Sequence, residues 1–396
     1  MRWTAGAALV VCLASQLALP TAAEAAPTKC EPERGNLPKS EITLAPWPQQ
    51  AMPLDKVHEH ATGRGVRVAV IDSGGDNNNP QLKFEPTIDL TRTGKRDCVG
   101  HGTEVAAIIG AKKGHSLFHG VAPDATIIPI KYAAAATQND PALLVKGIYE
   151  AIKARADIIN ISSETHAASP QLRAAVLQAT AKGILIVASA GNIDPERKGT
   201  PTPAFPAQYE EVLSVGSFGQ DGQVSQFSNA RTRVSVIAPG KDIVTIAPDG
   251  GYISKEGGTS FAAPFVAGVA ALVKQQHPEL NGQQIMTRIE RTAQGSKGDG
   301  SGSGQVSPLE AVTSVIDVNA VGAPRAEPGS LTLPRRDTVD ATTRAVALGI
   351  GGGALGLAAL VVAAGMVIPA GRRRGWKPGQ VTFSDDDTVT PTRRVR

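Results

Sequence analysis

Apolar runs alternate with stretches of helical character along the middle of the chain. Six runs are rich in Val, Ile and Ala and have the length of strands: residues 66–72, 125–132, 156–162, 184–192, 212–218 and 234–240. Helices are predicted to begin at His101 and to cover residues 141–155, 170–182, 260–276 and 282–291. Continuous apolar strands that alternate with helices predict an α/β fold, with a parallel sheet covered by helices on both faces.

The segments beside this pattern belong to it to different degrees. Residues 26–55 are rich in proline, and about 30 residues are too few to fold alone, so we expect an arm laid on the main domain, residues 56–318. Residues 295–304 have the glycine content of a linker, but the apolar stretch at residues 307–316 predicts a last helix that returns to the domain. The linker is expected instead at residues 319–344.

The N-terminus has the features of a secretory signal peptide. Residues 1–25 contain an Arg near the start, an apolar stretch and a final pattern of small residues, Ala-Glu-Ala. A permanent membrane helix is the alternative, but Ser15, Gln16 and Pro20 break the apolar stretch. We therefore expect this segment to be cleaved and the rest of the chain to be exported.

A second apolar segment near the C-terminus predicts a membrane anchor. Residues 345–368 carry no charge and would span roughly 36 Å as a helix, which is enough to cross a bilayer. Arg372, Arg373 and Arg374 follow the span and place the tail, residues 369–396, in the cytoplasm. The predicted location is the cell membrane, single-pass, with the main domain on the extracytoplasmic side.

Charge and cysteine content narrow the function. The 396 residues carry a formal net charge of +4, which is too small to indicate nucleic-acid binding. Once Cys12 leaves with the signal peptide, two cysteines remain in an oxidising compartment, and a disulfide between Cys30 and Cys98 is the favoured interpretation. A metal pair or a reactive thiol is the alternative, but the sequence offers neither one its neighbouring ligands or base.

Three short motifs supply an acid, a base and a nucleophile. Asp72 ends the first apolar run in VAVIDSG, where a buried carboxylate can orient an imidazole. His101 begins a helix in GHGTEVA, and Ser260 begins another in GGTSFAAP, where backbone N–H groups can face an oxyanion. Asn192 ends the strand that closes in SAGN, and its amide could donate to the same oxyanion. Each motif alone also fits an ordinary turn or helix cap, but together they predict a serine protease.

The remaining histidines do not form a second site in the sequence. His58 and His60 flank Glu59, but this run has no third ligand at a suitable spacing, so a solvated surface is expected rather than a zinc site. His115 and His119 are four residues apart, yet glycines on either side of the pair predict a loop. Since no acidic loop has calcium spacing either, we expect no metal and no cofactor.

The chain resembles the subtilisin-type serine proteases from about residue 66 to residue 316. The order acid, base, nucleophile is that of subtilisin, and further motifs keep the expected order: GVAPDATIIPIK, ADIINIS, SAGN, FPAQYEEVLSVGSF, FSN and IAPG. The resemblance implies a subtilisin-like fold in which Asp72, His101, Asn192 and Ser260 carry catalysis. It also implies that two short segments line the first specificity pocket: Ser162, Ser163 and Glu164 on one side, and Ser189, Ala190 and Gly191 on the other.

A narrower resemblance is to the mycosins, the membrane-anchored subtilisin-like proteases of type VII secretion systems. It rests on the short N-terminal extension, the stretch DCVGHGT at residues 97–103, the single C-terminal span and the basic tail. It implies an endopeptidase that cleaves exported protein substrates in association with the type VII secretion membrane complex. One departure is that Ser163, Glu164 and Thr165 stand where subtilisins have Leu-Gly-Gly, so we expect a narrower or more negative groove.

Two other functions stay open at this stage. The chain could be a structural subunit that stabilises a secretion complex and whose proteolysis is dispensable. The full catalytic set argues against a dead protease but leaves a dual role possible. A stand-alone surface protease without a partner complex is the third interpretation.

Overall fold

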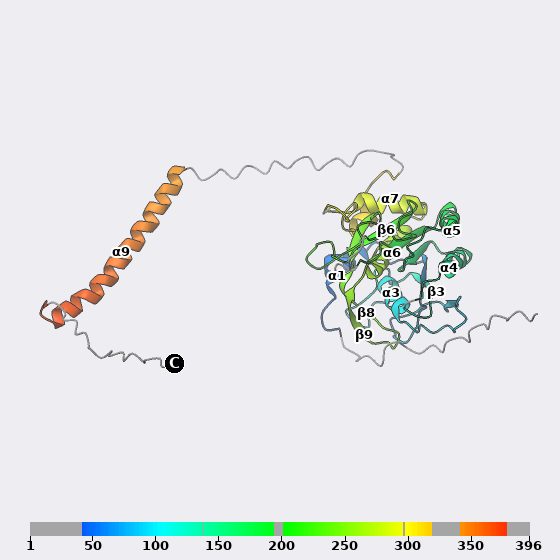
Figure 1. Ribbon diagram of the computed structural model, residues 1–396, viewed down its shortest axis with the longest axis horizontal. Coiled ribbons are helices and arrows are strands. Elements are labelled where there is room, and N and C mark those ends of the chain that lie inside the picture. Colours follow the sequence, from blue (N-terminus) through cyan, green and yellow to red (C-terminus); the bar gives the residue numbers. More distant parts are fainter. Residues whose placement is uncertain (1–41, 137, 194–200, 296–297, 319–340, 378–396) are drawn as a thin grey trace, which may run out of the picture. The chain divides into compact units, whose positions relative to one another are not determined.

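A computed structural model describes residues 42–136, 138–193, 201–295, 298–318 and 341–377. The chain divides into two compact units, residues 1–323 and residues 324–396 (Figure 1). The predicted signal peptide and Cys30 lie outside the described residues.

A seven-stranded parallel sheet forms the centre of the first unit. The strands are β1 (Arg67–Asp72), β2 (Ile88–Asp89), β3 (Thr126–Lys131), β4 (Ile158–Ile161), β5 (Leu185–Ser189), β6 (Val212–Phe218) and β7 (Val236–Pro239). They lie in the order β2-β3-β1-β4-β5-β6-β7, and each neighbouring pair is parallel. All six predicted apolar runs are strands of this sheet, so the predicted α/β fold is confirmed.

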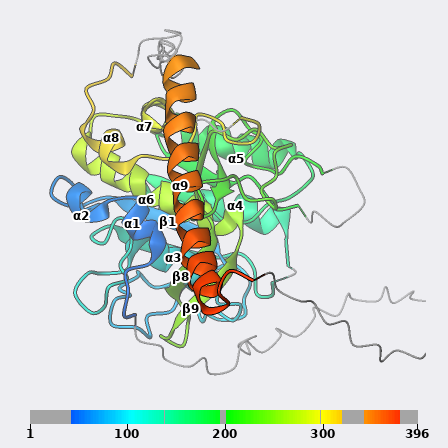
Figure 2. The same cartoon turned by 90° about the vertical axis from the view of Figure 1, so that its left-hand side faces the viewer.

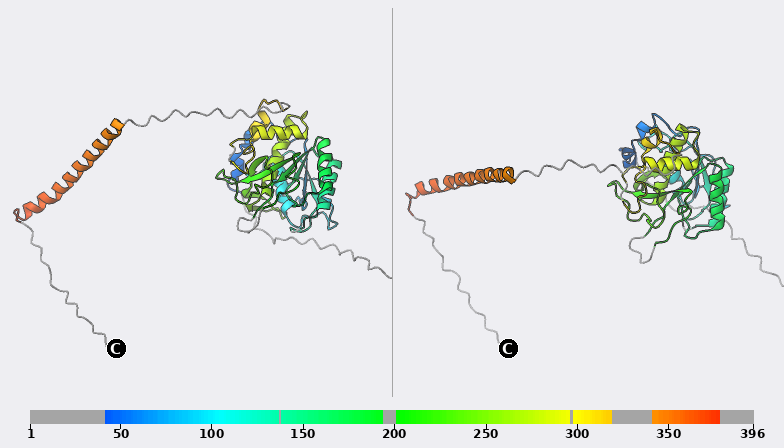
Figure 3. Two further views of the ribbon diagram at one scale, coloured as in Figure 1. Left: turned by 45° about the horizontal axis from the view of Figure 1, so that its top comes forward. Right: turned by 90° about the horizontal axis from the view of Figure 1, so that it is seen from above.

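Helices cover both faces of the sheet. They are α3 (His101–Gly110), α4 (Pro141–Lys153), α5 (Pro170–Ala181), α6 (Thr259–Gln276), α7 (Gly282–Thr292) and α8 (Pro308–Thr313). Side chains alternate between the faces of a strand. Val68 and Val70 of β1 therefore join the apolar cluster of α3 and α6, whereas Ala69 and Ile71 join that of α4 and α5. Figure 3 shows α4 and α5 together at one side of the body.

The structure adds several elements that the apolar runs did not predict. They are the edge strand β2, the helices α1 (Trp47–Ala51) and α2 (Leu54–Val57), and an antiparallel hairpin of β8 (Lys241–Ile246) and β9 (Tyr252–Gly257). The indole Nε1 of Trp47 donates to the carbonyls of Lys241 and Asp242, both at 3.1 Å, so α1 lies on the hairpin. Figure 2 shows α2 beside α8.

The second unit contains the helix α9 (Ala341–Arg373). Of the described residues, Val346–Arg373 form the one helix long and apolar enough to cross a membrane, with a mean hydropathy of 2.2. The predicted span at residues 345–368 falls within α9, which makes α9 a candidate membrane anchor.

Candidate active site

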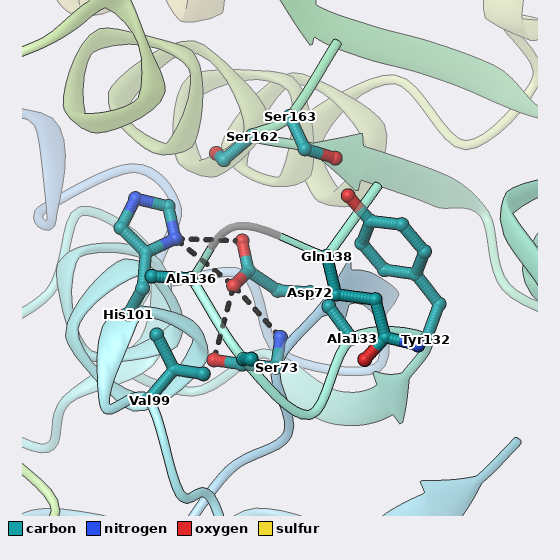
Figure 4. Close-up of a pocket in the computed structure, with 11 residues that line it drawn as sticks. Asp72, Ser73, Val99, His101, Tyr132, Ala133, Ala136, Gln138, Ser162 and Ser163 are labelled. Carbon is teal, nitrogen blue, oxygen red and sulfur yellow. Dashed lines mark hydrogen bonds and ion pairs between the residues drawn. The ribbon is translucent and has the colours of Figure 1, made fainter. Parts of the chain in front are cut away.

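Asp72 and His101 are in direct contact at the end of β1. The imidazole Nδ1 of His101 lies 2.9 Å and 3.0 Å from the two carboxylate oxygens of Asp72 (Figure 4). The side chain of Asp72 is only 6% exposed, and its Oδ1 also accepts the backbone N–H of Ser73 at 2.8 Å. The carboxylate is thus fixed from two sides. When the imidazole is neutral, this contact keeps its proton on Nδ1 and leaves the lone pair on Nε2.

The first turn of α3 positions His101, and Asp97 holds that turn. One oxygen of the Asp97 carboxylate accepts the N–H of Gly100 at 2.8 Å. The other accepts the N–H and the hydroxyl of Thr103 at 2.8 and 2.7 Å. Gly100 has a φ of +89°, which favours glycine, and a Cβ on Gly102 would collide with the backbone of Gly74. These contacts fix the helix that begins with the imidazole.

Lys131, at the end of β3, supports the segment before His101. Its side chain is fully buried, and its Nζ donates to the carbonyls of Gly94 and Arg96 at 3.0 and 2.8 Å. The ammonium also lies 3.3 Å from the sulfur of Cys98. Sequence reasoning assigned no role to Asp97 or Lys131. An Asp placed just before a helix start was a usable signal for Asp97, because such residues cap first-turn N–H groups, whereas a Lys within an apolar run gave none.

The environment of His101 favours its protonated form. Burial by itself lowers the pKa of His101, but the charge and the hydrogen bond of Asp72 outweigh it and raise the pKa from 6.5 to about 9. The more distant carboxylates of Glu104 and Asp97 act in the same direction. The imidazole is therefore set up to take a proton and hold it as an ion pair with Asp72.

Ser260 and Asn192 converge on one point at the start of α6. The side-chain Oδ1 of Asn192 accepts the N–H of Thr259 at 2.9 Å and its hydroxyl at 3.2 Å. This fixes the amide so that Nδ2 is the end left to donate elsewhere. A Cβ built on Gly258 would lie 3.0 Å from the Oγ of Ser260 and 3.6 Å from the Nδ2 of Asn192. A glycine at this position keeps the space between the hydroxyl and the amide open.

His101 contacts Phe261, the residue that follows Ser260. The ring of Phe261 packs edge-on against the imidazole, with the centroids 5.3 Å apart. No hydrogen bond between His101 and Ser260 is formed in the described part of the chain. Such bonds are often long in free enzymes and tighten when substrate binds. The structure therefore shows Asp72 and His101 in contact, with Phe261, the residue next to Ser260, packed on the imidazole.

A cavity of about 290 Å³ opens beside His101 and Asp72. Ser162 and Ser163, which follow β4, line its opposite wall together with Tyr132 (Figure 4). It gives an extended ligand room next to the imidazole.

Glu164 reaches from this wall to the end of β5. Its Oε1 would lie 3.4 Å from a Cβ on Gly191, so the carboxylate lies beside the segment that contains Gly191 and Asn192. Burial raises the pKa of Glu164. Ser189 and Ala190 are buried, at 1% and 0% exposure. The two segments expected to flank the specificity pocket therefore meet through the Glu164 side chain.

Comparisons with known proteins show the family of this chain. The Subtilase family matches residues 63–314. Mycosin-1 of Mycolicibacterium smegmatis is 32% identical over 383 residues, which cover 80% of this chain and 85% of that protein. An intracellular serine protease of Paenibacillus polymyxa is 34% identical over 67% of this chain and 86% of its own.

Solved structures of mycosins are also similar to this chain. The crystal structure of MycP1 without its N-terminal propeptide matches with a TM-score of 0.64 at 32% identity, covering 69% of this chain and all of that one. The structure of MycP3 protease, from the type VII (ESX-3) secretion system, matches with a TM-score of 0.59 at 32% identity, over 72% of this chain and 91% of that one.

Proposed function

The chain belongs to the subtilase family and is a serine endopeptidase related to the mycosins, and from this premise we propose that Asp72, His101 and Ser260 form its catalytic triad. Ser260 Oγ attacks the substrate carbonyl while His101 Nε2 removes its proton. Asp72 keeps the proton of the imidazole on Nδ1 and stabilises the imidazolium that forms. His101 then gives the proton to the leaving amine. In the second half of the reaction, water attacks the acyl-enzyme carbonyl, His101 takes the proton of that water, and the acid product leaves as Ser260 regains its proton.

Asn192 supplies the oxyanion donor in this proposal. Its Nδ2 faces the space above Gly258 that Ser260 also borders, at 3.6 Å and 3.0 Å from one point. A tetrahedral intermediate formed on Ser260 would place its oxygen within reach of that amide and of the first N–H groups of α6. Thr259 prevents the amide from turning, because it occupies the Oδ1 end.

The contact between Asp72 and His101 is the observation that carries the proposal, and labelling of Ser260 tests it. A fluorophosphonate probe reacts with an activated serine hydroxyl, and we expect it to modify Ser260 in the full-length chain. Ser260→Ala should remove both labelling and peptide hydrolysis, whereas the exposed Ser254→Ala serves as the matched control and should keep both. Labelling that persists in Ser260→Ala would contradict the assignment.

We propose that Ser162, Ser163 and Glu164 form one wall of the first specificity pocket and that Ser189, Ala190 and Gly191 form the other. The support is the position of the Glu164 carboxylate, which bridges the two segments beside Asn192. A carboxylate in this place leaves less room than the glycine of subtilisins, and it would favour small or basic substrate side chains.

The membrane-bound site of action is also a proposal. α9 would anchor the chain with its peptidase domain outside the cytoplasm, where it would cleave exported proteins next to a type VII secretion complex. The support is the apolar length of α9 and the 80% of the chain that aligns with mycosin-1. A structural role in such a complex is the second candidate, favoured by the anchor.

Secretion assays separate the two roles. If the chain is also a structural subunit, its deletion abolishes secretion, whereas Ser260→Ala at an equal protein level retains it and only leaves substrates uncleaved. Equal loss of secretion in both strains removes the support for a structural role.

We also propose that Cys98 pairs with Cys30. Cys98 lies buried three residues before His101. Cys30 is the other cysteine expected to remain after signal cleavage, so the bridge would hold the N-terminal arm near the catalytic base.

A further inference from the structure

Two histidines that lie far apart in the sequence meet where the N-terminal segment, the described residues 42–66 before β1, contacts the peptidase body. His58 directly follows α2, and His119 lies in the loop between α3 and β3. Their rings are 5.2 Å apart between centroids, and Asp55 completes the group. One ligand atom from each of these three residues lies within 4.8 Å of the others. Sequence spacing had paired each histidine with a different neighbour and had predicted no metal site.

Backbone carbonyls fix the tautomers of both imidazoles. His58 Nε2 donates to the carbonyl of Val121 at 2.8 Å, so its Nδ1 carries the lone pair. His119 Nδ1 donates to the carbonyl of Gly120 at 2.9 Å, so its Nε2 carries the lone pair. This pattern is typical of metal-ligating histidines, whose second nitrogen is held by a carbonyl or carboxylate.

The lone pair of His58 has no protein partner. Its Nδ1 is a fully buried atom without a hydrogen bond among the described residues. A buried acceptor left unpaired is unfavourable, so a ligand at this place would stabilise the protein. Burial lowers the pKa of both histidines, that of His58 to about 4.

Asp55 supplies the negative charge of the group, and its carboxylate forms an ion pair with Lys113. The carboxylate is 88% exposed and lies 4.0 Å from His119 Nε2 and 2.8 Å from the Nζ of Lys113. Lys113 is itself 40% exposed, so its long side chain can turn to water without disturbing the fold. A cavity of about 340 Å³ borders Asp55, Lys113 and His119 and gives access from solvent.

We propose that Asp55, His58 and His119 bind a divalent transition-metal ion, with zinc as the best match. Two imidazole nitrogens and one carboxylate form a common three-residue zinc set, in which water takes the fourth tetrahedral position. Zinc–nitrogen bonds are about 2.0–2.1 Å long, so the ligand atoms must draw closer than they are now. The exposed Asp55 side chain can make that movement. The ion would join α2 to the loop that follows α3, and so fasten the N-terminal segment to the body.

Calorimetric titration of the full-length chain tests this site. The protein is purified in detergent without a histidine tag, treated with chelator and titrated with Zn²⁺. We expect one Zn²⁺ to bind per chain with an affinity that depends on the three ligands. His58→Ala or His119→Ala should weaken this affinity at least about tenfold, which is the loss that even an outer-shell partner causes. Co²⁺ in place of Zn²⁺ should give the intense visible absorption of a tetrahedral site.

Control variants separate this site from general zinc binding. His60→Ala and His115→Ala remove neighbouring exposed histidines and should leave the affinity unchanged. Asp55→Asn changes an exposed side chain, so it tests the site without disturbing the core, and it should weaken Zn²⁺ binding. Lys113→Ala should strengthen it, because a competing positive charge is removed. The proposal is overturned if Zn²⁺ does not bind, or if the bound Zn²⁺ is insensitive to Asp55→Asn, His58→Ala and His119→Ala.

Discussion

The ion pair of Asp72 and His101 should set the pH at which the peptidase becomes active. The base must be neutral to accept the serine proton, so kcat/KM should rise with pH as His101 loses its proton. Because Asp72 raises the pKa of His101 from 6.5 to about 9, the midpoint of this rise should lie above 6.5 and toward 9. The displacement corresponds to about 3 kcal/mol in favour of the protonated imidazole.

Asp72→Asn isolates the cause of this shift. The amide keeps the shape of the side chain but removes its charge, which leaves burial opposed only by the more distant Glu104 and Asp97. The midpoint should therefore move down toward 6.5, and the maximal rate should fall about 10⁴-fold, as for other triads with this change. The measurement is kcat/KM for a peptide substrate between pH 5 and 10, with single-turnover rates to verify that chemistry limits. Asp221→Asn, on the exposed surface, is the control and should keep the original midpoint.

The same ion pair should make the native state less stable as pH rises, whereas activity rises with pH. A group whose pKa is raised by folding stabilises the native state below its unfolded pKa, here about 6.5. That contribution is lost as pH rises through the folded value of about 9. For the activity profile, a wild-type midpoint of kcat/KM at or below pH 6.5 would refute the reasoning. So would a kcat/KM midpoint that Asp72→Asn leaves unchanged.

Four further changes test the remaining contacts. Asp97→Ala should destabilise the chain by about 1–2 kcal/mol in denaturant unfolding, since it removes the carboxylate that accepts the N–H groups of Gly100 and Thr103 at the start of α3, while Asp97→Asn keeps an acceptor and should lose less; equal stabilities would contradict this role. Asn192→Ala should lower kcat about 10²–10³-fold with little change in KM, a magnitude known from subtilisin itself, and an unchanged kcat would remove Asn192 from the oxyanion site. Glu164→Gln should reduce kcat/KM for peptides with Lys or Arg before the cleaved bond about tenfold relative to small residues; an unaltered preference would leave Glu164 without a role in selection. Replacing Cys30 and Cys98 with Ser should destabilise the arm by up to about 4 kcal/mol, from closure of a loop of about 68 residues, and two free thiols found by mass spectrometry of the unreduced wild type would exclude the bridge.

The apolar pattern predicted the sheet because each parallel strand is buried on both faces. All of the residues of β5, Leu185–Ser189, are buried, and so are all of β6, Val212–Phe218. The starts of α4 and α5 were equally clear, since Asp140 and Ser169 cap helices that begin with proline. The hairpin β8–β9 was missed because its exposed polar positions interrupt the apolar run. α1 and α2 were missed because each is at most five residues long, and packing rather than periodicity determines such helices.

The candidate site was predictable where one short motif contains both the residue and its setting. Asp72, His101 and Ser260 each stand at a strand end or a helix start that their own neighbours define. The supporting contacts of Lys131 could not be found in this way, because its partners lie 33 to 37 residues earlier in the chain. They follow from the parallel packing of β3 beside β1, which no local pattern encodes.

The two proposed attachments of the N-terminal segment lie near the two ends of α3, and this arrangement would separate their effect on stability from any effect on catalysis. Cys98 lies just before the helix, and His119 lies in the loop beyond its end. The contacts that orient the imidazole come from Asp72 and Asp97, which belong to the body and not to the segment. A disulfide at one end and a metal ion at the other would therefore hold the segment on the surface without being needed to aim His101. Loss of either attachment should loosen residues before β1 first, since the buried sheet below them has its own core.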